Sequence, residues 1–548
     1  MSLPVLTSAA GLSGIFTHLL CFIRGDWEPR VTAIPTVYAA AEAVFLAYTV
    51  SAFGPYSVNT LFHFILLNVC HFTGLFASIL LYRAFFHRLR NFPGPFPARL
   101  STSWSAYMTL LDFRFGIRLQ GLHQQYGDLV RIRPREISIC HVDAVQDIHG
   151  PGTVCVKGPM YDINLPARSL QMTRDKAFHS RRRRAWDRAF TTSALSEFQP
   201  KVLEHCLDLV AQLSARIDQP VNFTSWMKYF SFDVMGDLAF GKSFNMVQTE
   251  GDHFILGLFA DMQPFLAVSA CMPWFFIVLK NLPIVNQKRA WFVNWCSQQV
   301  QERQKMGKSR RDLFSYILGD AGNGQNTAVE ITQQDLEFDS ELAIVAGSDT
   351  TSSVMTATIY LLARHPEKLH QLQAEIDQLV PPVDPLSYQS LIKDAPFLHA
   401  CINETLRLYP AVPAGVPRLT PSSGAIIAGT WIPGDTVVST PTYALHRDSR
   451  YFGQPEKFIP ERWTSQPELI YNKDAYSPFL VGSYSCVGKN LAWMEMRLLM
   501  YYMVKNFSFR FAPGTEKGVD HLFDGADGFK DFFTARPPGV NLVFSRRG

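Results

Sequence analysis

The sequence predicts a mostly α protein with small β-sheets, preceded by an N-terminal membrane region. Apolar stretches of near-transmembrane length occupy the first 91 residues, helical periodicity dominates the remainder, and strand-like runs are few and short. Of the 548 residues, 47% are hydrophobic and 18% are charged, with a formal net charge of +4. This composition excludes a disordered chain, and the small net charge gives no indication of nucleic-acid binding.

Three apolar stretches cover residues 6–23, 34–53 and 61–82. Each approaches the ~20 residues that a helix needs to cross a bilayer. Arg24 and Arg30 follow the first stretch and three arginines follow the third, whereas the loop between the second and third has no basic residue. With three crossings, the positive-inside rule places the N-terminus in the lumen and the remaining chain in the cytosol. The alternative is that the first stretch, which contains His18 and two glycines, lies in the membrane interface.

A short stretch rich in proline and glycine follows at residues 91–98. Proline fixes φ and removes a backbone donor, so this stretch resists regular structure. We therefore expect a stiff hinge between a membrane anchor, residues 1–90, and a single large domain, residues 99–548.

Helical periodicity in that domain predicts helices over residues 201–217, 336–363, 366–380, 400–408 and 490–506. Strand-like runs predict two hairpins, one pairing residues 129–133 with 137–141 and the other pairing 425–428 with 436–439 through a turn at 432–435. The apolar run over residues 254–279 fits either ordinary core or a lid that dips into the membrane. Nine scattered cysteines without a CxxC pair argue against a disulfide scaffold or a zinc ribbon.

One cysteine differs from the others by its surroundings. Cys486 lies in the segment Phe479-Leu-Val-Gly482-Ser-Tyr484-Ser-Cys486-Val-Gly488, directly before a predicted helix. Backbone N–H groups and the positive end of a helix stabilise a thiolate at such a position. Glycines let the backbone turn tightly and approach a flat ligand closely. A thiolate placed in this way can ligate haem iron, although a cysteine before a helix is by itself usually an ordinary buried thiol.

Three further motifs accompany this loop, and the four together resemble the cytochrome P-450 superfamily. The loop resembles the haem-binding pattern FxxGxRxCxG, and residues 346–351, Ala-Gly-Ser-Asp-Thr-Thr, match the oxygen-activation motif of a long apolar helix. Glu404-Thr-Leu-Arg407 matches ExxR, and Phe458-Ile-Pro460-Glu-Arg462-Trp matches FxPERW. Each motif is weak alone, but four in the family's order and spacing argue strongly against a chance match. The resemblance covers the chain after the hinge and implies the cytochrome P-450 fold.

The resemblance also implies roles for individual residues. Cys486 would be the axial thiolate ligand of haem b (iron protoporphyrin IX), with Phe479 packed near the sulfur and Gly488 shaping the loop. Asp349 and Thr350 would relay protons while the O–O bond is cleaved. The structural alternative for Thr350 is a hydrogen bond to its own helix. The remaining motif residues would form a buried structural triad, which comprises Glu404, Arg407 and Arg462.

The loop departs from the family at Tyr484, which stands where the usual arginine contacts a haem propionate. A tyrosine hydroxyl can donate one hydrogen bond but brings no charge. By resemblance, the other propionate partners are Arg183, His179 one helical turn earlier, and Arg418. The other arginines of the run 181–184 are expected on the surface, where they would meet an acidic reductase.

The resemblance implies an enzyme of the endoplasmic reticulum membrane whose catalytic domain faces the cytosol. It would be a haem-thiolate monooxygenase that uses O₂ to hydroxylate or epoxidise a lipophilic small molecule, similar to fungal members of secondary-metabolite biosynthesis. Electrons would come from NADPH through NADPH–cytochrome P-450 reductase, with cytochrome b5 as a second candidate donor, because no flavin or nicotinamide fingerprint occurs in this chain. Three alternatives stay open: an O₂-independent isomerase or dehydratase on the same fold, a non-catalytic haem sensor or membrane scaffold, and a cysteine hydrolase built on Cys486.

Overall fold

The protein is described here from a computed structural model. It describes residues 2–23, 25, 27–54, 58–251, 253–307, 310–317, 332–379, 388–515 and 518–547. Arg24, which contributes to the predicted charge pattern of the membrane loops, lies outside these residues.

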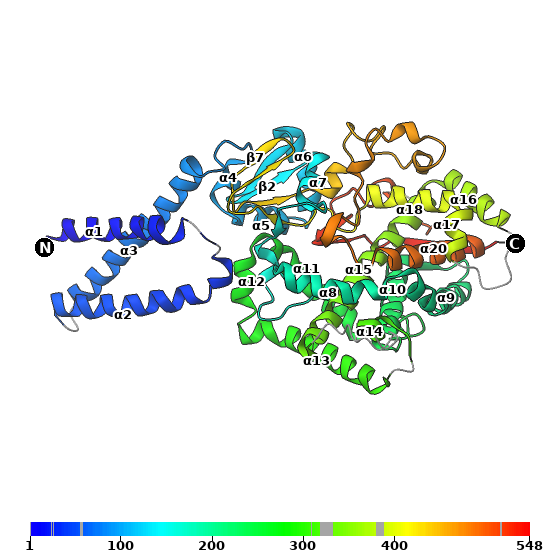
Figure 1. Ribbon diagram of the computed structural model, residues 1–548, viewed down its shortest axis with the longest axis horizontal. Coiled ribbons are helices and arrows are strands. Elements are labelled where there is room, and N and C mark those ends of the chain that lie inside the picture. The colour runs from blue at the N-terminus through cyan, green and yellow to red at the C-terminus, as the bar shows by residue number, and fades with distance from the viewer. Residues whose placement is uncertain are drawn as a thin grey trace.

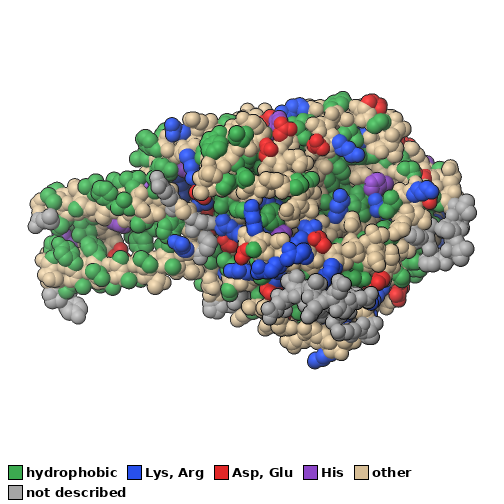
Figure 2. All heavy atoms as spheres, viewed as in Figure 1, with side chains coloured by type: hydrophobic (Ala, Val, Ile, Leu, Met, Phe, Trp, Pro, Cys, Tyr) green, Lys and Arg blue, Asp and Glu red, His purple; other side chains and the backbone are tan. Residues whose placement is uncertain are grey.

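The three apolar stretches form helices that project from the rest of the molecule (Figure 1). They are α1 (Leu3–Thr17), continued by η1 (His18–Phe22), then α2 (Ala33–Phe53), and then α3 (Val58–Leu81), continued by η3 (Tyr82–Phe86). All three are long and apolar enough to cross a membrane. Hydrophobic side chains cover this projecting part, whereas Lys, Arg, Asp and Glu gather on the remainder (Figure 2).

Small residues explain why α1 packs closely on α3. A Cβ atom added to Gly14 would lie 1.9 Å from the backbone oxygen of His71, and one added to Gly74 would lie 2.1 Å from that of Gly11. Larger side chains would therefore separate the two helices, as in the small-residue contacts of transmembrane helix pairs. The glycines of the first apolar stretch thus serve helix packing.

The predicted hinge is fixed to the large domain. The backbone oxygen of Pro93 accepts a hydrogen bond of 2.7 Å from the N–H of Arg131, and a Cβ on Gly94 would lie 2.4 Å from the oxygen of the same residue. The stretch ends in α4 (Phe96–Leu100), where Pro97 occupies the first turn of the helix, a position at which its missing N–H leaves no intrahelical bond unmade.

Helices dominate the large domain. Their bounds are α5 (Ser103–Leu110), α6 (Phe115–Tyr126), α7 (Asp143–His149), α8 (Lys176–Ala189), α9 (Thr192–Ser214), α10 (Phe223–Phe240), α11 (Phe254–Cys271), α12 (Pro273–Leu279), α13 (Pro283–Lys305), α14 (Leu313–Ile317), α15 (Gln333–Arg364), α16 (Pro366–Gln378), α17 (Tyr388–Asp394), α18 (Pro396–Leu408), α19 (Thr442–Leu445) and α20 (Lys489–Asn506). All five predicted helices are present, as parts of α9, α15, α16, α18 and α20, although the predicted ends at 217 and 380 lie beyond the ends of α9 and α16, and residue 380 is outside the described residues. Their buried faces join in one large core to which α10 also contributes.

In the described part of the chain, four small sheets accompany the helices. The largest has the order β1 (Leu129–Arg133), β2 (Glu136–Ile139), β8 (Val437–Ser439), β5 (Arg418–Leu419) and β3 (Val156–Lys157). A second has the order β4 (Pro220–Asn222), β12 (Asn541–Arg546) and β9 (Phe507–Phe511), and two hairpins pair β6 (Ala425–Ile427) with β7 (Thr430–Ile432) and β10 (Lys530–Phe532) with β11 (Thr534–Arg536). The predicted hairpin of β1 and β2 is confirmed.

The second predicted hairpin is wrong. Residues 425–427 pair with 430–432 rather than with 436–439. Ala428 and Gly429 both have positive φ, 47° and 70°, which is the geometry of a tight two-residue hairpin turn. Strand β8 instead joins the large sheet, parallel to β2 and antiparallel to β5, where Val438 is fully buried.

Candidate functional site

The loop before α20 is folded tightly against α7. The N–H of Cys486 donates to the oxygen of Phe479 at 2.9 Å. Gly482 has a φ of +70°, and a Cβ there would lie 2.2 Å from the backbone oxygen of His149, so only glycine fits. Burial raises the pKa of the Cys486 thiol, while the N–H groups of Gly488 and Lys489 and the charges of Arg183 and Lys489 act to lower it.

Cys486 opens into a cavity formed by several distant parts of the chain. The cavity is also lined by α8, by Ala346, Gly347 and Thr350 of α15, and by the segment after α18. Of the nine cysteines, all of which the structure describes, Cys486 alone lines it. Cys271, by contrast, lies in a separate cavity, where its sulfur contacts Thr109 and Arg133.

Four basic side chains gather around Tyr484 at one side of this cavity. The ring centroids of His179 and Tyr484 are 4.7 Å apart. The Arg418 guanidinium lies 5.0 Å and the Lys157 ammonium 5.1 Å from the Tyr484 ring centroid. Arg183 reaches the same loop and donates to the backbone oxygen of Ser485 at 2.7 Å. Three of the four, Arg183, Arg418 and His179, were predicted together with Tyr484.

Within this cluster, Arg183 forms an ion pair with Asp187 at 2.7 Å, whereas no carboxylate among the described residues pairs with Lys157 or Arg418. Lys157 and Arg418 face each other directly across the β3–β5 pair, an arrangement of like charges that destabilises a sheet. Burial, together with Lys157, Arg183 and Arg418, lowers the pKa of His179 to about 3, and burial together with Arg418 and Arg183 holds the pKa of Lys157 well below its usual range. The Nε of Arg418 is buried without a partner among the described residues. A ligand that carries two carboxylates could accept hydrogen bonds from the side chains of Lys157, Arg183 and Arg418.

Lys157 was missed in the sequence, because it lies on a two-residue strand with no motif of its own.

The expectation for the arginine run was also wrong at one position. Arg182 is not on the surface but 2% exposed, and it forms ion pairs with Asp335 at 2.6 Å and with Asp339. Two adjacent helical positions therefore point inward, Arg182 toward α15 and Arg183 toward the cysteine loop. Arg181 and Arg184 are exposed, as expected.

Thr350 and Asp349 point in different directions from α15. The Thr350 hydroxyl lines the cavity and donates to the backbone oxygen of Ala346 at 2.8 Å, the local bond that was the structural alternative. The Asp349 carboxylate instead accepts a hydrogen bond of 2.6 Å from the Thr534 hydroxyl of β11. Burial raises the pKa of Asp349, and Thr534, Lys228, Arg536 and Gln263 act to lower it.

These four partners of Asp349 come from α10, α11 and β11. Arg536 donates to Gln263 at 3.1 Å, which ties the C-terminal hairpin to α11. No sequence signal identified them, since they lie far from residue 349 in the chain. Gly347 next to them has a packing role, because a Cβ there would lie 2.6 Å from the sulfur of Met235 on α10.

The predicted triad is fully buried and connected. Glu404 contacts Arg407 at 2.8 Å and Arg462 at 2.8 Å, and it also accepts from the indole N–H of Trp463 at 2.9 Å. Burial acts to raise the pKa of Glu404, but the two arginines outweigh it and hold the pKa below its ordinary value. The arginines also donate to backbone oxygens of residues 446–457, so the triad joins α18 to the segment that precedes the cysteine loop.

Comparison with known proteins agrees with this arrangement. The family described as cytochrome P-450 matches residues 99–522. The chain is 39% identical over 547 residues to cytochrome P-450 monooxygenase nodW of Hypoxylon pulicicidum, covering 100% of this chain and 99% of that protein. It is 40% identical to cytochrome P-450 monooxygenase FCK2 of Fusarium pseudograminearum, covering 97% and 96%. It is 34% identical to tryprostatin B 6-hydroxylase of Aspergillus fumigatus, covering 98% and 96%.

The family match extends over most of the chain, and the alignment with nodW covers all of it, including the residues that form the N-terminal helices. Membership implies haem as the prosthetic group, and the cysteine loop and the uncompensated cations fit such a group. The chain therefore belongs to the cytochrome P-450 family and is a monooxygenase of the kind found in fungal secondary metabolism.

Proposed function

We propose that this protein is a membrane-bound haem-thiolate monooxygenase that hydroxylates or epoxidises a lipophilic secondary metabolite. The observation that carries the proposal is the cavity into which Cys486 opens, with Thr350 of α15 on its wall and, at its side, Lys157 and Arg418, which pair with no carboxylate among the described residues. The alternative of a cysteine hydrolase finds no support, since the ring of His179 packs against Tyr484 and its pKa of about 3 makes it a weak base.

In this proposal, Cys486 ligates the haem iron, and Phe479 and Gly488 shape the loop around the sulfur. Arg183, Arg418 and Lys157 neutralise the propionates, with hydrogen bonds from Tyr484 and His179. When bound, the haem supplies the activation of O₂ and the oxidation of the substrate. Lys157 of β3 and Arg418 of β5 thereby supply the positive charge that an arginine at position 484 would have provided.

The chain's own contribution to the chemistry is proton delivery and exclusion of water. Asp349 holds a proton at a carboxyl group that Thr534 orients away from the cavity, and Thr350, at the next position of α15, presents its hydroxyl to the cavity. A bridging water molecule or a turn of the Asp349 side chain would connect the two groups into a relay. Leu170, Leu342 and Val416 give the cavity an apolar wall, which suits a lipophilic substrate. Asp531 and Phe533, near the C-terminus, line the neighbouring small cavity instead.

We further propose that residues 1–90 anchor the enzyme in the endoplasmic reticulum membrane and that residues 99–548, after the 91–98 connection, face the cytosol. The connection between α1 and α2 contacts α12 at the domain through residues 28–30, so both belong on one side of the membrane. Exposed apolar residues on this side, Phe265, Trp274 and Phe275, fit a lid in contact with lipid through which substrate enters.

The reductase requirement and the reaction type can be tested together. The purified protein, with NADPH–cytochrome P-450 reductase, is incubated under ¹⁸O₂ with tryprostatin B and a panel of lipophilic metabolites. We expect a product that carries one ¹⁸O atom and that requires both NADPH and the reductase, with cytochrome b5 changing only the rate. A product formed without NADPH and without ¹⁸O would instead establish an isomerase or dehydratase.

A further inference from the structure

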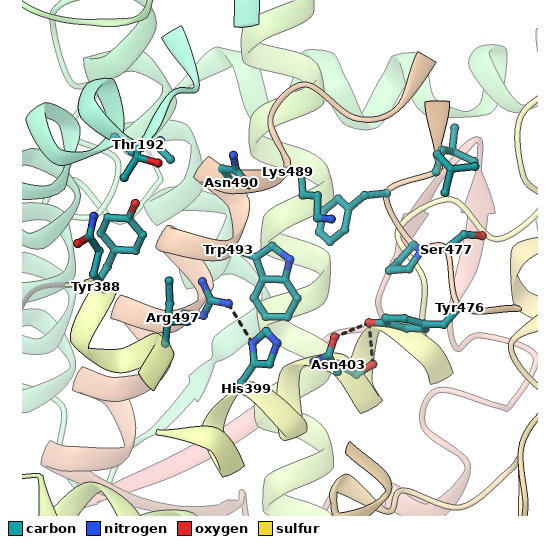
Figure 3. Close-up of a pocket in the computed structure, with 17 residues that line it drawn as sticks. Thr192, Tyr388, His399, Asn403, Tyr476, Ser477, Lys489, Asn490, Trp493 and Arg497 are labelled. Atoms are coloured by element: carbon teal, nitrogen blue, oxygen red, sulfur yellow. Dashed lines mark hydrogen bonds between the residues drawn. The ribbon is translucent and has the colours of Figure 1, made fainter. Parts of the chain in front are cut away.

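A second cavity lies beside the cysteine loop and has a volume of about 690 Å³. It shares residues 477–480 with the cavity that contains Cys486 but does not include Cys486 itself. Its walls come from the start of α9, from α17 and α18, from the segment before Cys486 and from α20 (Figure 3). This volume is in the range of about 300–1,000 Å³ that is typical of small-molecule sites.

Arg497 of α20 lines this cavity, and it is only 7% exposed. Its guanidinium lies 4.5 Å from the Trp493 ring centroid and donates to Nδ1 of His399 at 3.0 Å. Its Nε is buried without a hydrogen-bond partner, and among the described residues no carboxylate forms an ion pair with it. The side chain is therefore a buried cation that has no counter-ion within the described part of the chain.

Both side chains of this pair have defined protonation states at neutral pH. Burial, and then the charge of Arg497, lowers the pKa of His399 to about 4, so the neutral ring accepts the hydrogen bond. Burial lowers the pKa of Arg497 to about 10, with the Tyr388 hydroxyl acting against it, and the guanidinium stays charged. A buried charge without a partner is costly, and an unsatisfied buried donor calls for a binding partner.

Other groups around the cavity complete a site for an anion. Tyr388, Thr192 and Asn490 surround the side of the cavity that Arg497 lines, and Trp493 lies beside the guanidinium (Figure 3). Lys489 is exposed at the cavity wall and adds a second positive charge. Trp493 and Phe479, with ring centroids 6.3 Å apart, give an aromatic wall next to these polar groups.

We propose that this cavity binds a small aromatic carboxylate, whose carboxylate accepts hydrogen bonds from Arg497 and whose ring packs against Trp493. The site is independent of the substrate cavity and of the reaction proposed above. Because Phe479 and Leu480 border both cavities, a bound carboxylate would place a negative charge next to the cysteine loop.

The test uses the detergent-solubilised holoenzyme and isothermal titration calorimetry at constant ionic strength. The probe is benzoate, and neutral benzamide of nearly the same shape is its control. We expect saturable binding of benzoate, at least tenfold weaker binding of benzamide, and no change in the haem spectrum, which would respond to a ligand in the substrate cavity.

Variants assign the binding to Arg497. Arg497→Met should weaken benzoate binding at least tenfold, and Arg497→Lys, which keeps the charge but loses the planar fork, should weaken it less. Lys489→Met, at the exposed wall of the cavity, should weaken benzoate binding severalfold. Because Lys489 is exposed, this variant still tests the site if the Arg497 variants fail to fold. Arg510→Met, at an exposed arginine of β9 outside the cavity, is the matched control and should change nothing.

Two results would overturn the proposal. One is benzoate binding that is absent, or that is unchanged in Arg497→Met and Lys489→Met. The other is a set of variants that leave benzoate binding unaltered but weaken association with the reductase, which would assign Arg497 to an acidic side chain of the electron donor instead.

Discussion

At the scale of single residues, the Asp349 carboxylate is held by a partner nearly two hundred positions away in the chain. The Thr534 hydroxyl donates to it at 2.6 Å, and a hydrogen bond to a carboxylate stabilises its charged form. Thr534 thereby helps to set the pH at which Asp349 exchanges its proton. Neither residue type nor spacing reveals this contact, because β11 is a strand of only three residues.

Replacement of Thr534 by Val tests that role. The variant keeps the shape but loses the donor, so the pKa of Asp349 should rise and the pH profile of turnover should move upward by about one unit, since a hydrogen bond to a charged group contributes about 1.5–3 kcal/mol. Thr534→Ser keeps the hydroxyl and should restore the original profile. The measurement is product formation between pH 6 and 9. An unchanged profile in the valine variant would show that Thr534 does not set this titration.

Glu495 of α20 makes stability depend on pH. It is 1% exposed, burial raises its pKa to about 8, and its Oε2 has no partner among the described residues. The folded protein therefore holds a proton that the unfolded chain releases near pH 4.5, and stability falls as pH rises between these values.

The Glu495→Gln variant removes this titration. Relative to the parent protein, its stability should increase with pH from 5 to 8, by up to about 1.4 kcal/mol per pH unit. Thermal unfolding midpoints of both proteins, measured across this range, check the trend. A difference that stays constant with pH would mean that Glu495 is not protonated in the folded state.

The residues predicted for the site fall into two groups for a physical reason. Cys486 and the triad lie in recognisable sequence motifs, and the family resemblance indicated Arg183 and Arg418. Lys157 belongs to no motif, since the register of β3 against β5 places it opposite Arg418. Contacts across a sheet depend on pairing between distant segments, which local patterns do not determine.

At the scale of elements, the triad links α18 to η6 (Pro460–Trp463) and so positions the segment that leads to Cys486. Glu404→Gln leaves two buried guanidinium groups with one partial acceptor in place of a carboxylate. We expect a loss of about 3 kcal/mol in the free energy of unfolding, as for other broken buried ion pairs.

The matched control for this variant is Glu456→Gln, since the Glu456 side chain is 62% exposed in its pair with Arg447. Its effect should stay within about 0.5 kcal/mol. Denaturant unfolding monitored by circular dichroism compares the two. Equal effects would contradict a structural role for the buried triad.

The helices were predicted better than the strands. Residues 490–506 and 336–363 repeat apolar positions with helical period over several turns, and the structure contains both helices. The second hairpin failed because residues 436–439 are apolar enough to pair with either neighbour. The tight turn at Ala428 and Gly429 pairs residues 425–427 with 430–432, and burial in the larger sheet stabilises β8 there.

At the scale of the whole molecule, the proposed topology has three spans, which would place the N-terminus in the lumen and residues 99–548 in the cytosol. An N-terminal extension carrying a glycosylation sequon should therefore be glycosylated in microsomes, whereas the natural sequons at Asn222, Asn403 and Asn506 should stay unmodified. Digestion with an endoglycosidase, followed by gel mobility, reads out both. If only the second and third apolar stretches cross the membrane, the extension would stay unmodified, and the first apolar stretch would lie in the membrane interface.

The central claim is that Cys486 ligates haem iron through its thiolate. The most direct test is the absorption spectrum of the ferrous–CO complex of the detergent-solubilised protein and of Cys486→Ser. We predict a Soret band shifted far to the red in the parent protein and its loss in the variant, with folding checked by circular dichroism. A folded, haem-loaded parent protein without this band, or a variant that keeps it, would contradict the account.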